Sequence, residues 1–160
     1  MTQAKSRWRK LARECYERVL AETAGRCNIE DVKDQVRTEI RAQGISDDVL
    51  DDFVDGLVTG EDDRRASQAD SGQGDLFTGE PAALDAVWRL GSGERVQARH
   101  ATRADCYARL GLRAENVARV TESFAREQQR LAKLMPYMTD DTVTVEEALA
   151  AWNRAAPDAA

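Results

Sequence analysis

The chain has 160 residues, of which 42% are hydrophobic and 32% charged, and its formal net charge is −6. This length suits one domain, or two small ones joined by a linker. The acidic balance argues against a protein that coats nucleic acid or an anionic membrane. No apolar run is long enough to span a bilayer, and residues 1–10 lack the apolar core of a signal peptide. We therefore expect a cytoplasmic protein without membrane contact.

Residues 1–60 predict a bundle of three short helices. Apolar residues recur at steps of three and four in each segment, and Gly25, Gly44 and Gly60 are expected to end the helices. Asn28 is placed to cap the second helix. Amphipathic helices joined by glycine turns commonly pack as a small bundle.

The charge of the third predicted helix disfavours a helix-turn-helix protein that binds DNA. That helix would have to enter the major groove of a duplex that carries one negative charge per about 1.7 Å of its axis. It has no basic residue, and five aspartates: Asp47, Asp48, Asp51, Asp52 and Asp55. We interpret this surface as a solvated acidic face, or as a contact for a basic partner.

Residues 61–81 predict a mobile linker between this bundle and a second region at residues 82–156. The linker is polar, contains little to bury between Arg64 and Gly72, and ends in the turn signals before Pro81. Such a composition cannot offset the conformational entropy lost when a backbone becomes ordered.

One short stretch of this segment carries an apolar pair in polar surroundings. It consists of Gln73, Gly74, Asp75, Leu76 and Phe77. Leucine and phenylalanine side chains gain free energy only where something covers them. Either a partner protein binds them, or the pair begins the next folded region and packs on its surface.

The stretch resembles the peptide with which bacterial polymerases, repair factors and loaders bind the β sliding clamp of the replisome. Gln73, Asp75, Leu76 and Phe77 match that motif, whereas Gly74 stands where the family usually has leucine. The resemblance covers five residues. It implies that Leu76 and Phe77 enter an apolar cleft of the clamp while the Gln73 amide fixes the register.

The period of the sequence changes after Pro81. Residues 84–90 and 95–101 flank Gly91, Ser92 and Gly93, which predicts a β-hairpin with a short loop. Val96, Ala98 and His100 would share one face of the second strand, and Arg95, Gln97 and Arg99 would share the other.

Two further helical segments complete the C-terminal region. Thr102 and Thr144 are expected to cap helices, with Asp105 and Glu147 three residues later. Between 106 and 138 the apolar residues recur at helical spacing, which predicts one long helix or two helices broken near Gly111. The fold class is therefore mainly α with a small β-hairpin (α+β).

The hairpin followed by Ala101, Thr102, Arg103, Ala104 and Asp105 at the start of a helix resembles small uncharacterised proteins of phages and prophages. Together with the clamp-type peptide, this resemblance implies a phage-type adaptor or inhibitor that binds the host β sliding clamp.

Two alternatives use other parts of the chain. Arginines cluster around the hairpin and the following helix, so a two-stranded ribbon could bind nucleic acid through Arg89, Arg95, Arg99 and Arg103. The long helix could also dimerise, which would make the chain a helical assembly protein.

The sequence proposes no enzyme, and we expect no catalytic residue, cofactor or metal. There is no glycine-rich phosphate loop and no nucleophile elbow. The three cysteines, Cys15, Cys27 and Cys106, lack paired metal-ligand spacing, and the only histidine, His100, lies six residues before Cys106.

Overall fold

The computed structural model describes residues 2–45, 50–71, 77, 81–112 and 122–155. The helices are α1 (Thr2–Glu22), α2 (Ile29–Arg41), α3 (Leu50–Ser71), α4 (Pro81–Leu84), α5 (Arg103–Leu110), α6 (Glu122–Leu134) and α7 (Val145–Ala155), with short 3-10 turns η3 (Ala98–His100) and η5 (Met135–Tyr137). The strands are β1 (Arg26–Asn28), β2 (Val87–Arg89) and β3 (Glu94–Gln97). Within these residues, no helix is both long and apolar enough to cross a membrane.

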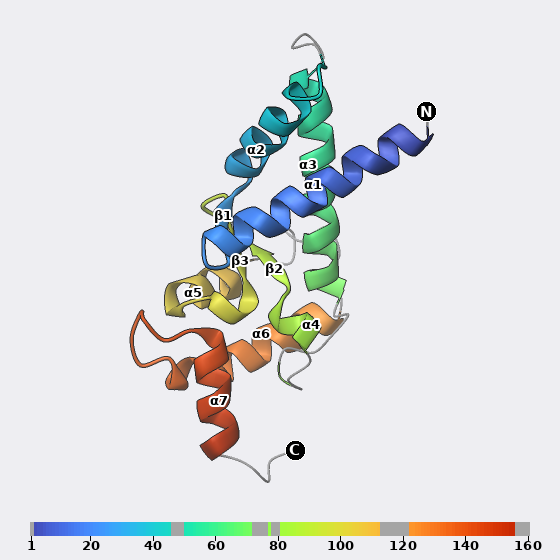
Figure 1. Cartoon of the computed structure of the whole chain (residues 1–160). Coiled ribbons are helices and arrows are strands. Elements are labelled where there is room, and N and C mark those ends of the chain that lie inside the picture. The colour runs from blue at the N-terminus through green and yellow to red at the C-terminus, as the bar shows by residue number, and fades with distance from the viewer. Residues whose placement is uncertain (1, 46–49, 72–76, 78–80, 113–121, 156–160) are drawn as a thin grey trace.

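The three strands form one antiparallel sheet in the order β1-β3-β2. Strands β2 and β3 are the predicted hairpin, shorter than expected because the chain turns into η3 at Ala98. The sheet lies in the middle of the molecule, with α1, α2 and α3 on one side and α5, α6 and α7 on the other (Figure 1). The predicted fold class is confirmed, and strand β1 is an addition to it.

The two faces of the sheet belong to two different hydrophobic cores. Cys27 and Val87 are buried with the N-terminal helices, in a cluster that includes the fully buried Tyr16. Trp88 and Val96, which are paired across the strands, are buried with α5, α6 and α7. Because successive residues of a strand point to opposite faces, three short strands divide the molecule into two packed layers.

A glycine directs the chain from α1 into β1. Gly25 has φ +86°, a left-handed conformation that suits glycine, and its N–H donates to the Leu20 carbonyl at 2.7 Å. A Cβ at this position would collide with the imidazole of His100. The Gly25 carbonyl accepts from the Gln97 N–H at 2.6 Å, so this turn joins the first helix to the end of the hairpin.

The predicted helix caps are present. The Asn28 side chain accepts a hydrogen bond from the Glu30 N–H at 3.2 Å at the start of α2. The Asp105 carboxylate accepts from the Thr102 N–H at 2.8 Å, and the Glu147 carboxylate accepts from the Thr144 N–H at 2.9 Å. Each pair satisfies backbone donors that a helix start leaves without partners.

The predicted end of the third helix at Gly60 is wrong. Helix α3 continues to Ser71, so residues 61–71 are helical and not part of a linker. Glu61 and Asp62 are buried there although they are acidic, because arginines bind them. Arg64 and Arg65 of the same helix bind Glu61, and Arg89 and Arg95 of the hairpin bind Asp62. Strand β1 moreover pairs with β3, which places residues of the first sixty and of the hairpin in one sheet.

The described residues between 106 and 138 do not form one continuous helix. Helix α5 ends at Leu110, with Gly111 at its C-terminal cap, and α6 begins at Glu122. Leu131 and Leu134 of α6 are fully buried in the C-terminal core. These apolar residues, which were a candidate dimer seam, stabilise the fold of the single chain.

Candidate functional site

The predicted partner-binding residues fall largely outside the described part of the chain. Gln73, Asp75 and Leu76 lie in the undescribed residues, whereas Phe77 is described. Phe77 is half-buried and packs against the edge of the C-terminal core.

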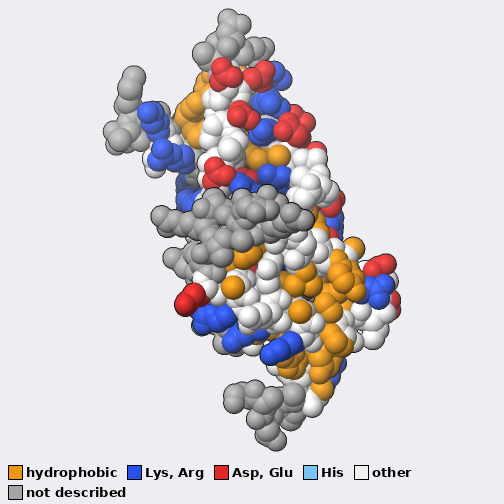
Figure 2. Space-filling view, turned by 180° about the vertical axis from the view of Figure 1, so that it is seen from behind, with side chains coloured by type: hydrophobic (Ala, Val, Ile, Leu, Met, Phe, Trp, Pro, Cys, Tyr) orange, Lys and Arg blue, Asp and Glu red, His pale blue; other side chains and the backbone are white. Residues whose placement is uncertain are grey.

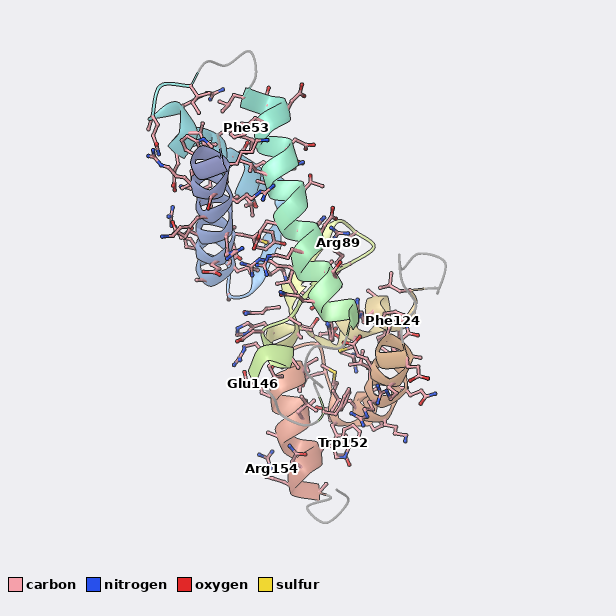
Figure 3. All side chains as sticks on the ribbon, turned by 90° about the vertical axis from the view of Figure 1, so that its right-hand side faces the viewer. Phe53, Arg89, Phe124, Glu146, Trp152 and Arg154 are labelled. Atoms are coloured by element: carbon pink, nitrogen blue, oxygen red, sulfur yellow. The ribbon has the colours of Figure 1, made fainter. Side chains whose placement is uncertain are left out.

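The ring of Phe77 contacts an aromatic corner formed by Tyr137 of η5 and Trp152 of α7. The Phe77 and Trp152 centroids are 5.5 Å apart with the planes at 60°, and the Trp152 and Tyr137 rings stack at 6.1 Å. The guanidinium carbon of Arg130 on α6 lies 5.6 Å from the Phe77 centroid. Figure 3 shows Trp152 on the side of α7 that faces α6.

This corner belongs to an apolar region of the surface. Figure 2 shows hydrophobic side chains gathered on the lower half of the molecule, the half that contains α6 and α7. Tyr137 and Trp152 are both half-buried beside the C-terminal core. A ring such as that of Phe77 therefore finds an apolar contact at this place without entering the core.

The arginines proposed for nucleic-acid binding are paired within the molecule. Arg89 and Arg95 lie on the sheet face that is turned toward α3, and both bind Asp62. Arg95 donates from Nε and Nη2 to the two Asp62 carboxylate oxygens at 3.0 and 2.8 Å. Arg89 Nε donates to Asp62 Oδ2 at 2.8 Å, and Arg89 also pairs with Asp63.

The other two arginines of that group are paired nearer the surface. Arg99 contacts Asp85 at 2.7 Å and Glu146 at 3.2 Å. Arg103 contacts Asp141 at 3.2 Å. The sequence correctly placed Arg95 and Gln97 on one face of the hairpin, but the partner of that face is a helix of the same chain.

Asp62 is the centre of a buried polar network that no local pattern in the sequence indicates. Its side chain is 1% exposed and accepts a further hydrogen bond from the Tyr16 hydroxyl at 2.6 Å. Burial raises the pKa of Asp62, but the hydrogen bonds from Arg95 and Tyr16 outweigh it, so the pKa lies below its usual value. Burial, followed by the nearby Asp62 charge, raises the pKa of Tyr16.

A second buried carboxylate joins β1 to α5. Arg26 Nη1 donates to Asp105 Oδ1 at 3.1 Å and to Glu94 Oε2 at 3.0 Å. Burial opposes ionisation of Asp105, yet the hydrogen bonds from Arg26 and Thr102 hold its pKa below the usual value. Asp105 therefore both caps α5 and anchors the strand, and only the first role could be recognised from sequence.

The thiols do not form a nucleophilic or metal-binding site. All three cysteines are buried and free, and burial raises the pKa of Cys15 to about 12, of Cys27 to about 11 and of Cys106 to about 12. Thiols of this kind are protonated at neutral pH and react slowly. Among the described residues, no group of three or more His, Cys, Asp or Glu is arranged to hold a metal ion.

Comparison with family models, with curated proteins and with solved structures found no match to this chain. The function must therefore be inferred from the residues and their geometry.

The pairing of the arginines leads to a prediction for nucleic acid. We expect the full chain to bind duplex DNA weakly at low salt and to lose that binding near physiological salt, because Arg89 and Arg95 are already paired with Asp62 and Asp63. Fluorescence anisotropy over a salt series measures this. Arg99→Ala/Arg103→Ala is the test variant, and Arg154→Ala on the exposed end of α7 is the control. Sequence-selective binding at physiological salt that only the double variant abolishes would contradict the prediction.

Proposed function

We propose that this chain is a non-enzymatic, phage-type adaptor or inhibitor that binds a bacterial β sliding clamp through residues 73–77. The proposal is carried by the match of Gln73, Asp75, Leu76 and Phe77 to the clamp-binding peptide. Phe77 packs on the edge of the C-terminal core, as the alternative of a pair covered by the next folded region predicts, but its ring is only half-buried and so stays within reach of a partner.

The strength of this binding follows from the chemistry of the peptide. Burying one leucine and one phenylalanine is worth roughly 1.5–3 kcal/mol each. The Gln73 amide can both donate and accept, which fixes the register of the peptide in the cleft. After the cost of ordering the segment, a dissociation constant of about micromolar size remains.

The contact between Phe77 and Trp152 lowers the apparent affinity. A ring that packs at 5.5 Å from Trp152 must leave that position before it can enter a cleft of another protein. The fraction of molecules with a free Phe77 then scales the apparent dissociation constant. Binding by the full chain is accordingly weaker than binding by an isolated peptide of the same sequence.

The two alternatives have less support from the geometry. The arginines required for a nucleic-acid surface are paired with carboxylates, and two of them, Arg89 and Arg95, are bound to the buried Asp62. The helix required for a coiled-coil dimer is interrupted after Leu110. The clamp-type peptide depends on neither arrangement.

The decisive experiment titrates purified β clamp with the full chain and with three variants. Phe77→Ala should weaken binding by more than about tenfold, because a fully buried phenylalanine is worth about 3–5 kcal/mol. Gly74→Leu should tighten binding by restoring the side chain usual in the motif. Trp152→Ala should also tighten it, since the intramolecular contact of Phe77 is removed.

Tyr107→Ala is the matched control, because Tyr107 is an aromatic residue that is 61% exposed and distant from the peptide in sequence. It should bind the clamp as the wild type does. Displacement of the bound chain by a polymerase tail peptide would locate binding in the shared cleft. Absence of wild-type binding, or equal binding by Phe77→Ala, would reject the proposed function.

A further inference from the structure

An open groove lies between the N-terminal half of α1 and the middle of α3. Its volume is about 650 Å³, and its floor is formed by α3, through Phe53, Gly56, Leu57 and Gly60. Figure 1 shows that α1 crosses α3 and that its N-terminal half extends beyond it. Figure 3 shows Phe53 on the upper part of α3, where the two helices meet. This groove is remote from Phe77 and takes no part in the proposed clamp contact.

The floor contains two glycines that the fold itself does not require. Gly56 and Gly60 are four residues apart and so lie on one face of α3. A Cβ at either position would have no heavy atom within 4 Å, and neither glycine has a positive φ. Glycine in a helix interior costs about 1 kcal/mol relative to alanine. These residues therefore lower the stability of α3 without serving any contact of the described chain.

Glycines in this spacing remove side chains from a strip of helix surface and so permit close approach of another backbone. Phe53 and Leu57, both half-buried, flank that strip with apolar surface. The Phe53 ring is further held edge-on by Trp8 of α1, with centroids 6.5 Å apart. The floor of the groove is thus an apolar surface with an exposed strip of helix backbone beside it.

The rim of the groove is basic. Lys5, Arg9 and Arg13 recur every fourth residue along α1, and Arg64 closes the far end. Arg13 and Arg64 are near Glu61, whereas Lys5 and Arg9 are exposed and have no hydrogen bond or ion pair with any residue of the described chain. Figure 2 shows Lys and Arg side chains gathered at the end of the molecule where α1 begins.

Two acidic residues also line the groove. Glu61 is bound by Arg64 and Arg65, so its charge is already neutralised. Asp52 has no ion pair within the described chain and lies on the floor side, on α3. Among the lining residues without an ion pair in the described chain, Lys5 and Arg9 outnumber Asp52, and their excess of positive charge favours a ligand that brings negative charge.

We propose that the α1–α3 groove binds an acidic amphipathic helix of a partner protein. Small apolar side chains of that helix lie over Gly56 and Gly60, its larger ones contact Phe53 and Leu57, and its carboxylates pair with Lys5 and Arg9. This is the helix-in-groove mode of recognition, in which an apolar face gives the affinity and the charged rim sets the orientation. Nucleic acid fits less well, because phosphates gain nothing from an apolar floor.

The test uses the full chain and a synthetic probe. The probe is a fluorescent, stapled helix of about five turns with an Ala/Leu stripe and glutamates on the opposite face. A second probe carries lysine in place of each glutamate. We expect the acidic probe to bind saturably and to lose affinity as salt is raised, and the basic probe not to bind.

Gly56→Leu is the sharpest variant, because it fills the floor while adding a better helix former to an exposed position. We expect it to raise thermal stability and to weaken probe binding at least about tenfold. Lys5→Glu/Arg9→Glu should weaken binding to a similar degree without unfolding. Arg126→Glu/Lys133→Glu, at two exposed residues of α6, makes the same change in net charge and should bind as the wild type does.

The proposal fails if the acidic probe does not bind, or if Gly56→Leu or the charge-reversed pair binds it unchanged. A dimer in sedimentation experiments that Gly56→Leu dissociates would assign the groove to a second copy and overturn it. Binding of duplex DNA that requires Lys5 and Arg9 but is unchanged by Gly56→Leu would also overturn the proposal. None of these results bears on the clamp peptide, since Phe77→Ala leaves the groove intact.

Discussion

Replacing Asp62 by alanine should lower the free energy of unfolding by about 3–5 kcal/mol, as expected when one partner of a buried ion pair is removed. The variant leaves Arg95, which is 14% exposed, without its two carboxylate contacts and leaves the Tyr16 hydroxyl without its acceptor. Within the described part of the chain, Arg89 keeps its contact with Asp63. Equilibrium urea denaturation followed by circular dichroism measures the loss.

The neighbouring residue provides the control. Asp63 pairs with the same Arg89, but its side chain is 60% exposed, so Asp63→Ala should cost less than about 1 kcal/mol. Equal effects of the two substitutions would show that burial of the network contributes nothing.

Three buried carboxylates, each held by arginines, contribute to stability in acid. Asp62, Glu61 and Asp105 have pKa values below their usual ones in the folded protein, so each binds a proton more readily after unfolding. Their contribution is fully present above the unfolded-state values of about 3.9 for Asp and 4.3 for Glu. It is lost as the pH falls through the lower folded-state values. The Asp62→Ala variant should therefore show a shallower loss of stability below about pH 4 than the wild type.

Replacing Trp88 by alanine should destabilise the protein by about 3–5 kcal/mol, which corresponds to a melting temperature lower by roughly 6–20 °C. Trp88 is 1% exposed and fills the face of the sheet that contacts the C-terminal core. The guanidinium carbon of Arg109 lies 5.3 Å from its ring, so the substitution also removes a buried cation–π contact.

Trp8→Ala is the matched control for Trp88, because Trp8 is only partly buried at the edge of the N-terminal core. Differential scanning calorimetry should show a smaller decrease in melting temperature for Trp8→Ala than for Trp88→Ala. A loss below about 1 kcal/mol for Trp88→Ala would mean that the C-terminal core closes over the cavity.

The helices of this protein could be predicted because their apolar residues and caps are local signals. The stripe that places Tyr16 and Val19 on one face of α1 is visible in the sequence, as is the pairing of Thr144 with Glu147. The hairpin could be located from its glycine loop. In each case the interacting residues are close together in the chain, so spacing alone is informative.

The features that could not be predicted depend on distant partners. Strand β1 has three residues and becomes a strand only by pairing with β3. Residues 61–71 have the composition of a linker, yet Arg89 and Arg95 make burial of Asp62 favourable and extend the helix. A charged segment is predicted to be unfolded unless the residues that form ion pairs with it are known.

The candidate sites show the same limit. The sequence placed Arg95 and Gln97 correctly on one face of the hairpin, whereas Arg99, predicted to share that face, lies in η3. It could not tell whether the face meets DNA or a carboxylate of the chain. The sequence indicated that the apolar side chain of Phe77 should be buried against something, but it did not identify Trp152 as the residue that it contacts. The α1–α3 groove was not recognised at all, although Gly56 and Gly60 within a helical stretch could have signalled it.

The position of β3 between β1 and β2 also determines how this chain reaches its native state. Arg26 and Glu94, 68 residues apart, meet in the completed sheet, so the N-terminal strand has no partner until the hairpin has been synthesised. Closing so long a loop costs entropy before the pairing can offset it. Helices form far faster than such distant contacts. We therefore expect closure of the sheet to be the slow step in the folding of this mostly helical protein. During synthesis, β1 cannot pair until β3, in the second half of the chain, has been made.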